Sequence, residues 1–428
     1  MRTRARDLTS ILGRSLRRAA LLPALLCALI AIASNSAQAQ TLSVIHDFTG
    51  RADGNGPEAG LTIDGHDNLY GTTASGGSTC SCGTAFKLTQ RGSGWTLAPL
   101  YMFQGDARTD GNAPQSKVII GPNGTLYGTT AAGGEGTCNF GEGCGTVYNL
   151  RPPASAPASA LTPWTETVLY RFAGGADGES PGPATLVFDS TGNLYGTTEL
   201  GGSAGLGTVY KLTPGNGGWT KTELHSFTGA QDGSHPMSGV IFDNAGNLYG
   251  TTSDGGANGL GTVYQLTPAG SGWTETTLHA FSGSSDGQFP WGAVLSDGAG
   301  NFYGTTTSGG DGNAGTAYKL TFSNGSWSFA VIHSFTRSDA ASPVDSLIMD
   351  SSGSLYGTAL NGGLNNIGAV FKLMPSDGSW SFRSLHNFSD SDGNFPFGSL
   401  VFDQSGNLYG TTEGGGTNEN GVVFNIVP

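Results

Sequence analysis

Charged residues are scarce in this sequence, and basic residues are the scarcer kind. Only 12% of the 428 residues are charged, with 19 Lys and Arg against 32 Asp and Glu and a formal net charge of −13. Six of the basic residues lie within the first 18 positions, so residues 40–428 hold 13 basic and 31 acidic residues, a net charge of −18. Such a surface repels phosphate backbones, and we therefore expect no nucleic-acid partner.

A long apolar run occurs only once. It spans residues 19–33, follows a leader with six Arg, and precedes Ala37-Gln38-Ala39, a small-x-small cleavage site. This three-part pattern predicts a secretory signal peptide over residues 1–39. A membrane anchor is the alternative, but the run is shorter than the ~20 residues that a spanning helix needs. We expect residues 40–428 to be secreted, periplasmic or held in the cell envelope, without a membrane span.

Sequence signatures of catalysis are missing as well. The chain has no nucleophile elbow, no His-Glu-x-x-His, no phosphate-binding loop and no Ser/His/Asp set that can be placed in one site. No catalytic residue, metal ligand or cofactor is therefore assigned, and the leading expectation is a protein without enzymatic activity.

Glycine, proline and aromatic residues are abundant instead. The 72 Gly and 19 Pro make up about a fifth of the chain, which excludes a mainly helical protein. Gly has no three-residue period, which excludes collagen. A hydrophobic content of 37%, with 7 Trp, 13 Tyr and 21 Phe, is too high for a disordered chain. The composition favours many short strands that share a sizeable core.

The string Tyr-Gly-Thr recurs seven times and indicates the fold. Its copies lie 53 to 68 residues apart, near the period of propeller blades, and begin at Tyr70, Tyr127, Tyr195, Tyr249, Tyr303, Tyr356 and Tyr409. One copy predicts four strands, at residues 239–243, 248–252, 261–267 and 273–281. Strands joined by tight turns pair antiparallel. Seven such units predict an all-β fold, a seven-bladed β-propeller that fills residues 40–428 as a single domain.

The two ends of the repeat array predict how the ring closes. The last copy stops after its third strand, at residues 421–427, and an orphan strand at residues 41–48 precedes the first copy. The orphan ends in Ile45-His46-Asp47-Phe48, which matches Leu278-His279-Ala280-Phe281 at the end of a fourth strand. We expect the N-terminal strand to complete the last blade, because this pairing removes the open edge of a linear array.

Three residue types recur about once per blade, which favours structural roles for them. Asp-Gly pairs after the fourth strand predict turns, with a ring of cation-binding carboxylates as the alternative. His residues two places before a Phe predict packing between blades, because side chains on outer strands diverge and cannot share a metal. Trp residues that open the fourth strand predict core positions. The sets are Asp53, Asp110, Asp177, Asp232, Asp286 and Asp392; His46, His225, His279, His333 and His386; and Trp95, Trp164, Trp219, Trp273, Trp327 and Trp380.

Four cysteines follow the leader, two in each of the first two blades. Cys80 and Cys82 share one loop and Cys138 and Cys144 share the next, in each case between the second and third strands. Export favours disulfides, and Cys138–Cys144 closes a plausible small loop. Cys80–Cys82 spans only one residue, so pairing across blades is the alternative. A tetrahedral zinc site that uses all four cysteines is a further alternative.

The residues around the Pro before each first strand differ between blades, so we expect function there. Three blades carry large side chains on both sides of this Pro, and an aromatic patch with a few polar groups at a concave mouth is typical of a binding site. The predicted binding residues are His235, Met237, Phe289, Trp291, Arg337, Phe395, Phe397 and Glu58. Alternatively, these side chains plug the channel, or Glu58 and Glu179 form an acid/base pair, which would depend on their separation.

The repeat also resembles a known family. Leu-His-Ser-Phe-x-Gly-x-x-Asp-Gly, Gly-Asn-Leu-Tyr-Gly-Thr-Thr and Gly-Thr-Val-Tyr-Lys-Leu-Thr-Pro, read over residues 224–252 and 195–214, are similar to the GloVer (choice-of-anchor) tandem repeats of bacterial exported proteins. The resemblance covers residues 41–428 and implies an envelope or secreted β-propeller, with no catalytic residues to transfer. Members often carry a C-terminal anchor of variable kind, whereas this chain ends at Pro428 directly after a strand and so departs from that pattern.

These observations together predict an exported, monomeric and non-enzymatic binding or scaffold module. A polysaccharide at the channel mouth or an envelope protein is the expected partner. A carbohydrate-active hydrolase or lyase on the same scaffold is the alternative. A purely structural protein with no ligand is the third hypothesis.

Overall fold

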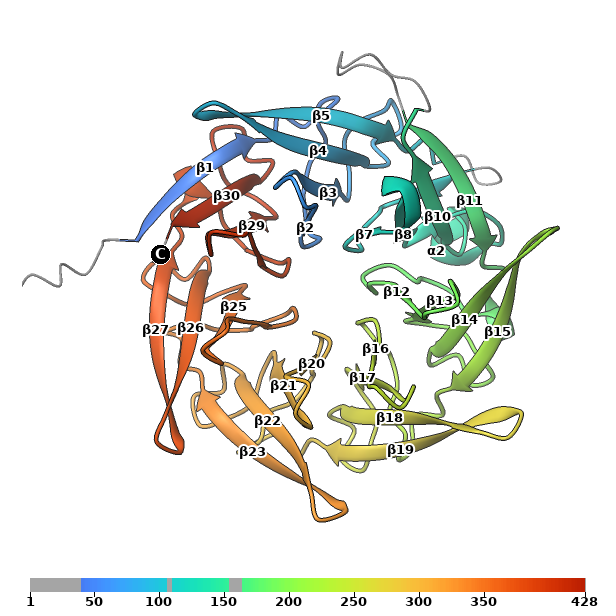
Figure 1. Cartoon of the computed structure of the whole chain (residues 1–428), viewed down its shortest axis with the longest axis vertical. Coiled ribbons are helices and arrows are strands. Elements are labelled where there is room, and N and C mark those ends of the chain that lie inside the picture. Colours follow the sequence, from blue (N-terminus) through green and yellow to red (C-terminus); the bar gives the residue numbers. More distant parts are fainter. Residues whose placement is uncertain (1–39, 106–109, 154–163, 428) are drawn as a thin grey trace, which may run out of the picture. The chain divides into compact units, whose positions relative to one another are not determined.

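The computed structural model describes residues 40–105, 110–153 and 164–427, and the predicted signal peptide lies outside the described residues. Residues Leu42–Val427 form one compact unit. In this unit seven four-stranded antiparallel sheets stand as blades around a central axis (Figure 1). The predicted seven-bladed propeller is confirmed. No helix among the described residues is long and apolar enough to cross a membrane.

Each blade runs outward from a short inner strand to a long outer one. Blade 1 is β2 (Thr62–Ile63), β3 (Leu69–Thr73), β4 (Thr84–Arg91) and β5 (Gly94–Met102); blade 2 is β7 (Ile119–Ile120), β8 (Leu126–Thr130), β10 (Thr146–Arg151) and β11 (Thr165–Arg171); blade 3 is β12 (Val187–Phe188), β13 (Leu194–Thr198), β14 (Thr208–Gly215) and β15 (Gly218–Ser226); blade 4 is β16 (Ile241–Phe242), β17 (Leu248–Thr252), β18 (Thr262–Ala269) and β19 (Gly272–Ala280).

The remaining blades repeat this order. Blade 5 is β20 (Leu295–Ser296), β21 (Asn301–Thr306), β22 (Thr316–Ser323) and β23 (Ser326–Ser334); blade 6 is β24 (Ile348–Met349), β25 (Leu355–Ala359), β26 (Ala369–Ser376) and β27 (Ser379–Asn387); blade 7 is β28 (Val401–Phe402), β29 (Leu408–Thr412), β30 (Val422–Val427) and β1 (Thr41–Asp47). The loops add the short pair β6 (Gly111–Asn112) and β9 (Ala132–Gly133), the helical turn α2 (Cys138–Gly141), and 3-10 turns at Pro122–Gly124, Gly175–Asp177 and Asp390–Asp392.

Ring closure follows the prediction. The strand order of blade 7 is β1-β30-β29-β28, so the N-terminal strand is its outer strand. The inner strands are shorter than predicted: blade 4 has Ile241–Phe242 where residues 239–243 were expected. Gly239 lies so close to the backbone of Thr185 in blade 3 that a Cβ would collide with its carbonyl oxygen. In blade 4 the residues before Ile241 therefore pack against blade 3 near the axis, and only Ile241 and Phe242 pair with β17.

One Thr hydroxyl per blade ties each blade to the next. The first Thr of the Tyr-Gly-Thr-Thr string, or of Tyr-Gly-Thr-Ala in blade 6, donates its hydroxyl to a backbone carbonyl on the inner segment of the following blade. Thr251 reaches Gly292 at 3.0 Å, and Thr411 reaches Ala59 at 3.0 Å across the closure of the ring. The other bonds are Thr72 to Ser116, Thr129 to Gly182, Thr197 to Ser238, Thr305 to Asp345 and Thr358 to Gly398. We call these seven bonds the Thr latches.

Packing explains why the Tyr-Gly-Thr string has a glycine at its second position. In blade 4 the ring of Tyr264, on the third strand, lies over Gly250, where a Cβ would come within 2.4 Å of the Tyr264 hydroxyl oxygen. That ring is fully buried, and its hydroxyl has no hydrogen-bond partner among the described residues. The same holds for Tyr148, Tyr210 and Tyr318, whereas blades 1, 6 and 7 carry Phe86, Phe371 and Phe424.

Hydrophobic clusters lie between neighbouring blades. In each of six of them the Trp of one blade joins the Tyr-Gly-Thr tyrosine of the preceding blade. The ring centroids of Trp95 and Tyr409 are 5.6 Å apart, and those of Trp380 and Tyr303 are 6.0 Å apart. The predicted core role of the Trp residues is confirmed.

A second recurring contact ties the end of each outer strand to the loop that follows. The His or Tyr two places before the Phe donates to the loop Asp, over 2.7 to 3.2 Å, in the pairs His46–Asp53, Tyr101–Asp110, Tyr170–Asp177, His225–Asp232, His279–Asp286, His333–Asp339 and His386–Asp392. The same carboxylate accepts a backbone N–H, as from Thr49 to Asp53 at 2.9 Å, so the turn prediction is confirmed. We call these pairs the loop clasps.

The histidine clasps need no positive charge. Burial lowers the pKa of His46, His225 and His279, although the Asp partners oppose the shift. A neutral imidazole still donates one N–H, and a carboxylate can only accept. The predicted packing of His between blades also occurs, because the ring of His279 stacks on Phe329 of the next blade at 3.7 Å.

The residue two places after each Trp faces the clasp of the preceding blade. In blade 3 it is Lys221, whose Nζ lies 3.1 Å from Asp177. In blade 4 it is Glu275, where burial and the charge of Asp232 raise the glutamate pKa to about 7. The interface between blades 3 and 4 therefore carries a carboxyl pair that is unfavourable at neutral pH.

We predict that Thr251→Val destabilises the protein by about 1–3 kcal/mol, because the Gly292 carbonyl is left without its donor. The matched control is Thr274→Val, at an exposed position on β19 of the same blade, which should change stability by less than ~0.5 kcal/mol. Urea unfolding measures both. Equal effects for the two variants would contradict the role of the latch.

We predict that Tyr264→Phe leaves stability unchanged or raises it by about 1 kcal/mol, because it removes a buried hydroxyl without a partner. Phe86, Phe371 and Phe424 already occupy this position in three blades. Thermal unfolding of the variant measures the effect. A loss above ~1 kcal/mol would show that the hydroxyl has a partner.

We predict that acidification from pH 8 to pH 5 stabilises the interface between blades 3 and 4. The pKa of Glu275 is higher in the folded state than in the unfolded chain, so its favourable contribution is present at low pH and lost as the pH rises through about 7. Melting temperatures of wild type and Glu275→Gln should converge at pH 5, with the variant the more stable at pH 8. A wild type that melts at pH 8 at the same temperature as Glu275→Gln, or at a higher one, would refute this.

Candidate functional site

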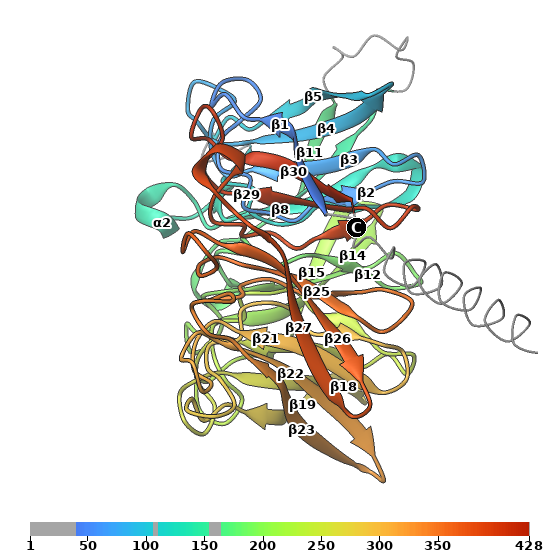
Figure 2. The same cartoon turned by 90° about the vertical axis from the view of Figure 1, so that its left-hand side faces the viewer.

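The loops after the second and fourth strands gather on one face of the ring, which we call the mouth face. The helical turn α2, in the loop after the second strand of blade 2, marks this side (Figure 2). A cavity of about 630 Å³ lies at the axis, and residues from the inner segments of all seven blades line it. In each blade a Pro, which we call the loop Pro, ends the loop that leads to the first strand. The residues between this Pro and the first strand, which we call the inner segment, line the cavity.

Two layers of residues form the part of this cavity that lies nearest the mouth face. The rim layer holds Glu58, Gln115, Pro183, Met237, Trp291, Val344 and Phe397. Two residues further along each segment, the second layer holds Gly60, Lys117, Thr185, Gly239, Ala293, Ser346 and Ser399. The aliphatic side chains of Val187, Ile241, Leu295 and Ile348 line the cavity beyond the second layer.

The rim has one apolar wall and one polar wall. Blades 4 to 7 contribute Met237, Trp291, Val344 and Phe397, and the ring centroids of Trp291 and Phe397 lie 6.4 Å apart. On the other side Glu58 accepts a hydrogen bond of 2.9 Å from Gln115 in the neighbouring blade. An apolar surface opposite a few convergent polar groups is the usual form of a small-molecule site.

Burial perturbs the titratable groups of the cavity. It raises the pKa of Glu58 to about 7, with added repulsion from Glu413, and it also raises the pKa of Glu199. Burial raises the pKa of Asp345 and lowers that of Lys117, and the attraction between these two groups opposes both shifts. Ionisable groups with shifted pKa values in one cavity are typical of functional sites.

The structure separates the predicted binding residues into two groups. Glu58, Met237, Trp291 and Phe397, which follow the loop Pro, line the cavity. The residues before the loop Pro, which are His235, Phe289 and Phe395, do not belong to its lining, and Arg337 is exposed in a loop outside it.

Backbone geometry accounts for this division. The residue before the loop Pro has a positive φ in all seven blades, as in His235 at 55° and Phe289 at 58°. In blade 4 its N–H donates to Leu206 of the preceding blade at 2.9 Å, and its carbonyl accepts from Ser253 at 3.0 Å. Hydrogen bonds thus hold the left-handed backbone in place, and the chain turns there so that the residue after the loop Pro lines the cavity.

The structure does not bring Glu58 and Glu179 into one cavity. Glu179 lies outside the lining, with a carboxylate oxygen 2.7 Å from the Sγ of Cys138. Reasoning from the sequence missed two cavity residues, Lys117 and Glu199. Aligning the repeats three residues after the loop Pro would have singled out Lys117, the one long side chain among small ones.

The cysteines pair within their own loops, as Cys80–Cys82 and Cys138–Cys144. Pairing across blades, the alternative to Cys80–Cys82, is therefore wrong. The zinc alternative fails as well, because a sulfur in a disulfide is not a thiolate ligand.

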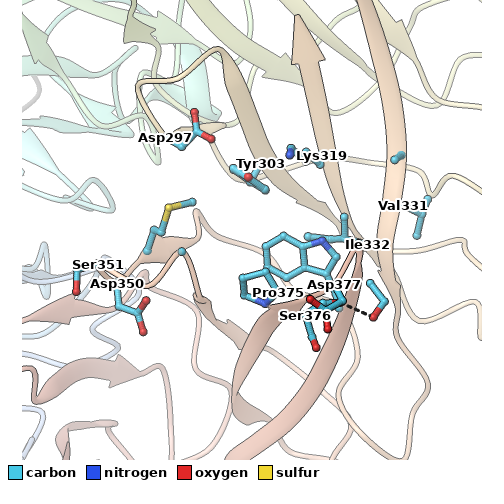
Figure 3. A pocket seen from close by; sticks show the side chains of 16 residues that line it. Asp297, Tyr303, Lys319, Val331, Ile332, Asp350, Ser351, Pro375, Ser376 and Asp377 are labelled. Atoms are coloured by element: carbon cyan, nitrogen blue, oxygen red, sulfur yellow. Dashed lines mark hydrogen bonds between the residues drawn. The ribbon is translucent and has the colours of Figure 1, made fainter. Parts of the chain in front are cut away.

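A second hollow lies between blades 5 and 6, away from the axis (Figure 3). This groove of about 1060 Å³ holds Asp297, Tyr303 and Lys319 from blade 5 and Met349 and Asp350 from blade 6. Its carboxylates already serve their own turns: Asp350, for example, accepts bonds from the backbone and hydroxyls of the residues Ser352, Ser354 and Tyr356. At the position of Met349, blades 3, 4 and 7 carry Phe188, Phe242 and Phe402, and blades 1, 2 and 5 carry Ile63, Ile120 and Ser296.

Solved structures with similar folds share little sequence with this chain. An ancestral GH74 enzyme aligns with a TM-score of 0.52 and 13% identity, over 87% of this chain and 48% of its own. A candidate 6-phosphogluconolactonase from Bacteroides uniformis gives a TM-score of 0.49 and 14% identity, over 80% and 89%. At these identities the likeness concerns the fold alone. No curated protein matches the chain.

A protein-family comparison is more specific. The model of the Gloeobacter/Verrucomicrobia repeat matches residues 31–167, 139–277 and 241–428, which together span all seven blades. This is the family that the Tyr-Gly-Thr-Thr repeats resemble, and the chain belongs to the Gloeobacter/Verrucomicrobia repeat family.

Proposed function

We propose that this protein is an exported binding module that holds a carbohydrate at the mouth of its central channel. The observation that carries the proposal is the mixed rim, in which Trp291 and Phe397 line the same cavity as the hydrogen-bonded pair of Glu58 and Gln115. The repeat family and the propeller fold fit a binding or scaffold role.

A sugar ring matches this arrangement chemically. Its C–H face is apolar and packs on an aromatic ring, while its hydroxyls need donors and acceptors at the edge. Trp291 and Phe397 offer the aromatic surface. Gln115 and Glu58 offer amide and carboxyl groups on the same rim, where a sugar hydroxyl can replace water.

The position of the site within the repeat also supports binding. The Thr latches and the loop clasps recur in all seven blades, whereas the rim layer has a different residue in every blade. A rigid, repeated frame that presents one variable layer is suited to recognition, because the site is formed before the ligand arrives.

Export is supported by two features. The leader has the pattern of a signal peptide, and the structure holds two disulfides, which persist in oxidising compartments. The partner would then be a polysaccharide of the cell surface or its surroundings. An envelope protein is the alternative partner.

A carbohydrate-active enzyme is the second candidate function. It is favoured by one observation: Glu58, with a pKa raised to about 7, shares the cavity with Glu199. A carboxyl group with such a pKa suits a general acid at neutral pH. In that case Glu58→Gln abolishes turnover of a bound oligosaccharide, whereas a binding module shows no turnover at all.

We predict that Trp291→Ala weakens oligosaccharide binding at least tenfold, which is about 1.4 kcal/mol, because it removes the largest apolar surface of the rim. Residues 40–428 are screened against soluble oligosaccharides by thermal unfolding, where saturation at 100 times Kd adds about 2.7 kcal/mol. Calorimetry on the hits then gives Kd.

Leu364→Ala is the matched control, because Leu364 is 83% exposed on the mouth face and lies outside the cavity. This variant should bind as the wild type does. Binding that survives in Trp291→Ala, or the absence of any binding oligosaccharide, would contradict the proposal.

A further inference from the structure

We propose that the ligand of the channel mouth carries a carboxylate, as a uronic acid does, and that Lys117 binds it. This inference rests on the proposed carbohydrate function and names the class of sugar. It assigns Lys117 as a specificity-determining residue in the second layer of the cavity.

Lys117 stands out by its surroundings. The other six residues of the second layer are Gly60, Thr185, Gly239, Ala293, Ser346 and Ser399, all of them small. Their size leaves space around the one long side chain of the layer. The layer lies two residues below the rim, which is about 7 Å along an extended strand. A pyranose ring stacked on Trp291 therefore has room to direct an exocyclic carboxylate down to this depth.

The ammonium group of Lys117 lacks a hydrogen-bond acceptor. Among the described residues it forms no hydrogen bond and no ion pair, although it lines the cavity. Burial lowers its pKa, which means that the charged form is poorly solvated there. An ammonium group has three N–H donors, and a carboxylate is the natural partner for them.

Asp345 does not fill this role. Its carboxylate accepts the backbone N–H of Ser346 at 2.6 Å and that of Ser399 on the neighbouring blade. Both oxygens are therefore engaged by the wall of the cavity. The attraction between Asp345 and Lys117 favours the charged form of the lysine, and no hydrogen bond joins the two side chains among the described residues.

Hydroxyl groups complete a layer that is rich in donors. Thr185, Ser346 and Ser399 line the cavity at the level of Lys117. The Ser346 hydroxyl accepts the N–H of Ala293 at 3.0 Å and hydrogen-bonds the Asp345 carboxylate, so it belongs to the wall of the cavity. The ammonium group of Lys117 and the hydroxyls of Thr185 and Ser399 around a small space are a suitable set for a carboxylate.

The acidic groups that face this site make its affinity depend on pH. Glu58, Glu199 and Asp345 line the cavity, and Asp345 acts on Lys117. Glu413 acts on Glu58, and His235 acts on Glu199. The pKa of Glu58 is raised to about 7, and that of Glu199 is also raised. Protonation of Glu58 as the pH falls through about 7 removes its repulsion, while a uronic acid stays ionised. Binding should therefore strengthen as the pH falls from 8 to 6.

The test compares trigalacturonate with its methyl ester, which has the same ring and no charge. Calorimetry on residues 40–428, the compact ring with its N-terminal strand, gives Kd at pH 6 and pH 8. We expect the acid to bind at least tenfold more tightly than the ester at pH 6, with a smaller ratio at pH 8. Lys117→Met should bring the ratio close to one. Lys319→Met, which removes a lysine from outside the cavity, should leave it unchanged.

Each result decides a separate point. Equal affinity for acid and ester in the wild type, with Trp291→Ala still abolishing binding, overturns the carboxylate inference and leaves the carbohydrate function intact. Preference for an amine-bearing chitosan trimer over trigalacturonate at pH 6 overturns it in favour of cation binding by the acidic groups of the cavity. No binding of any oligosaccharide overturns both proposals. The comparison of acid and ester needs only the wild type, so it stands even if Lys117→Met fails to fold.

Discussion

The hydrogen bond from one Thr hydroxyl in each blade to the inner segment of the next blade is the interaction on which the ring depends. Thr411 to Ala59 makes this contact between the last and first blades, so the same bond that joins neighbours also closes the circle. Each inner segment is thereby held by its own second strand and by the preceding blade. The residues that follow the loop Pro are consequently held at the same height around the axis, which produces the layers of the cavity.

Most of the fold could be predicted from the sequence because the pattern occurs seven times. A single Leu-Tyr-Gly-Thr-Thr could belong to many folds, but seven copies at one period indicate a propeller, and β17 has the predicted bounds. The inner strand of blade 4 was predicted too long, because the crowding of Gly239 against Thr185 at the axis is a contact between blades. The loop clasps were also beyond prediction, since His and Asp meet only once the loop has folded.

The candidate site could be predicted only in part, for a geometric reason. Residues on both sides of the loop Pro look equivalent in the sequence, but the left-handed backbone before the Pro leaves only those after it in the cavity. Trp291 and Phe397 were thus predicted where the structure brings them together, whereas Phe289 and Phe395 lie outside the lining. Lys117 was not predicted because a single lysine is not unusual by itself. It differs only from the Gly, Ala, Ser and Thr residues that the other blades carry at the same position.

The central claim is that the channel mouth holds a sugar whose carboxylate meets Lys117. A crystal structure of the protein with bound trigalacturonate tests it most directly. We predict a sugar ring against Trp291 and a carboxylate oxygen about 2.7–2.9 Å from the Nζ of Lys117. A ligand seated in the groove between blades 5 and 6, or a sugar at the mouth with its carboxylate turned to solvent, would contradict the account.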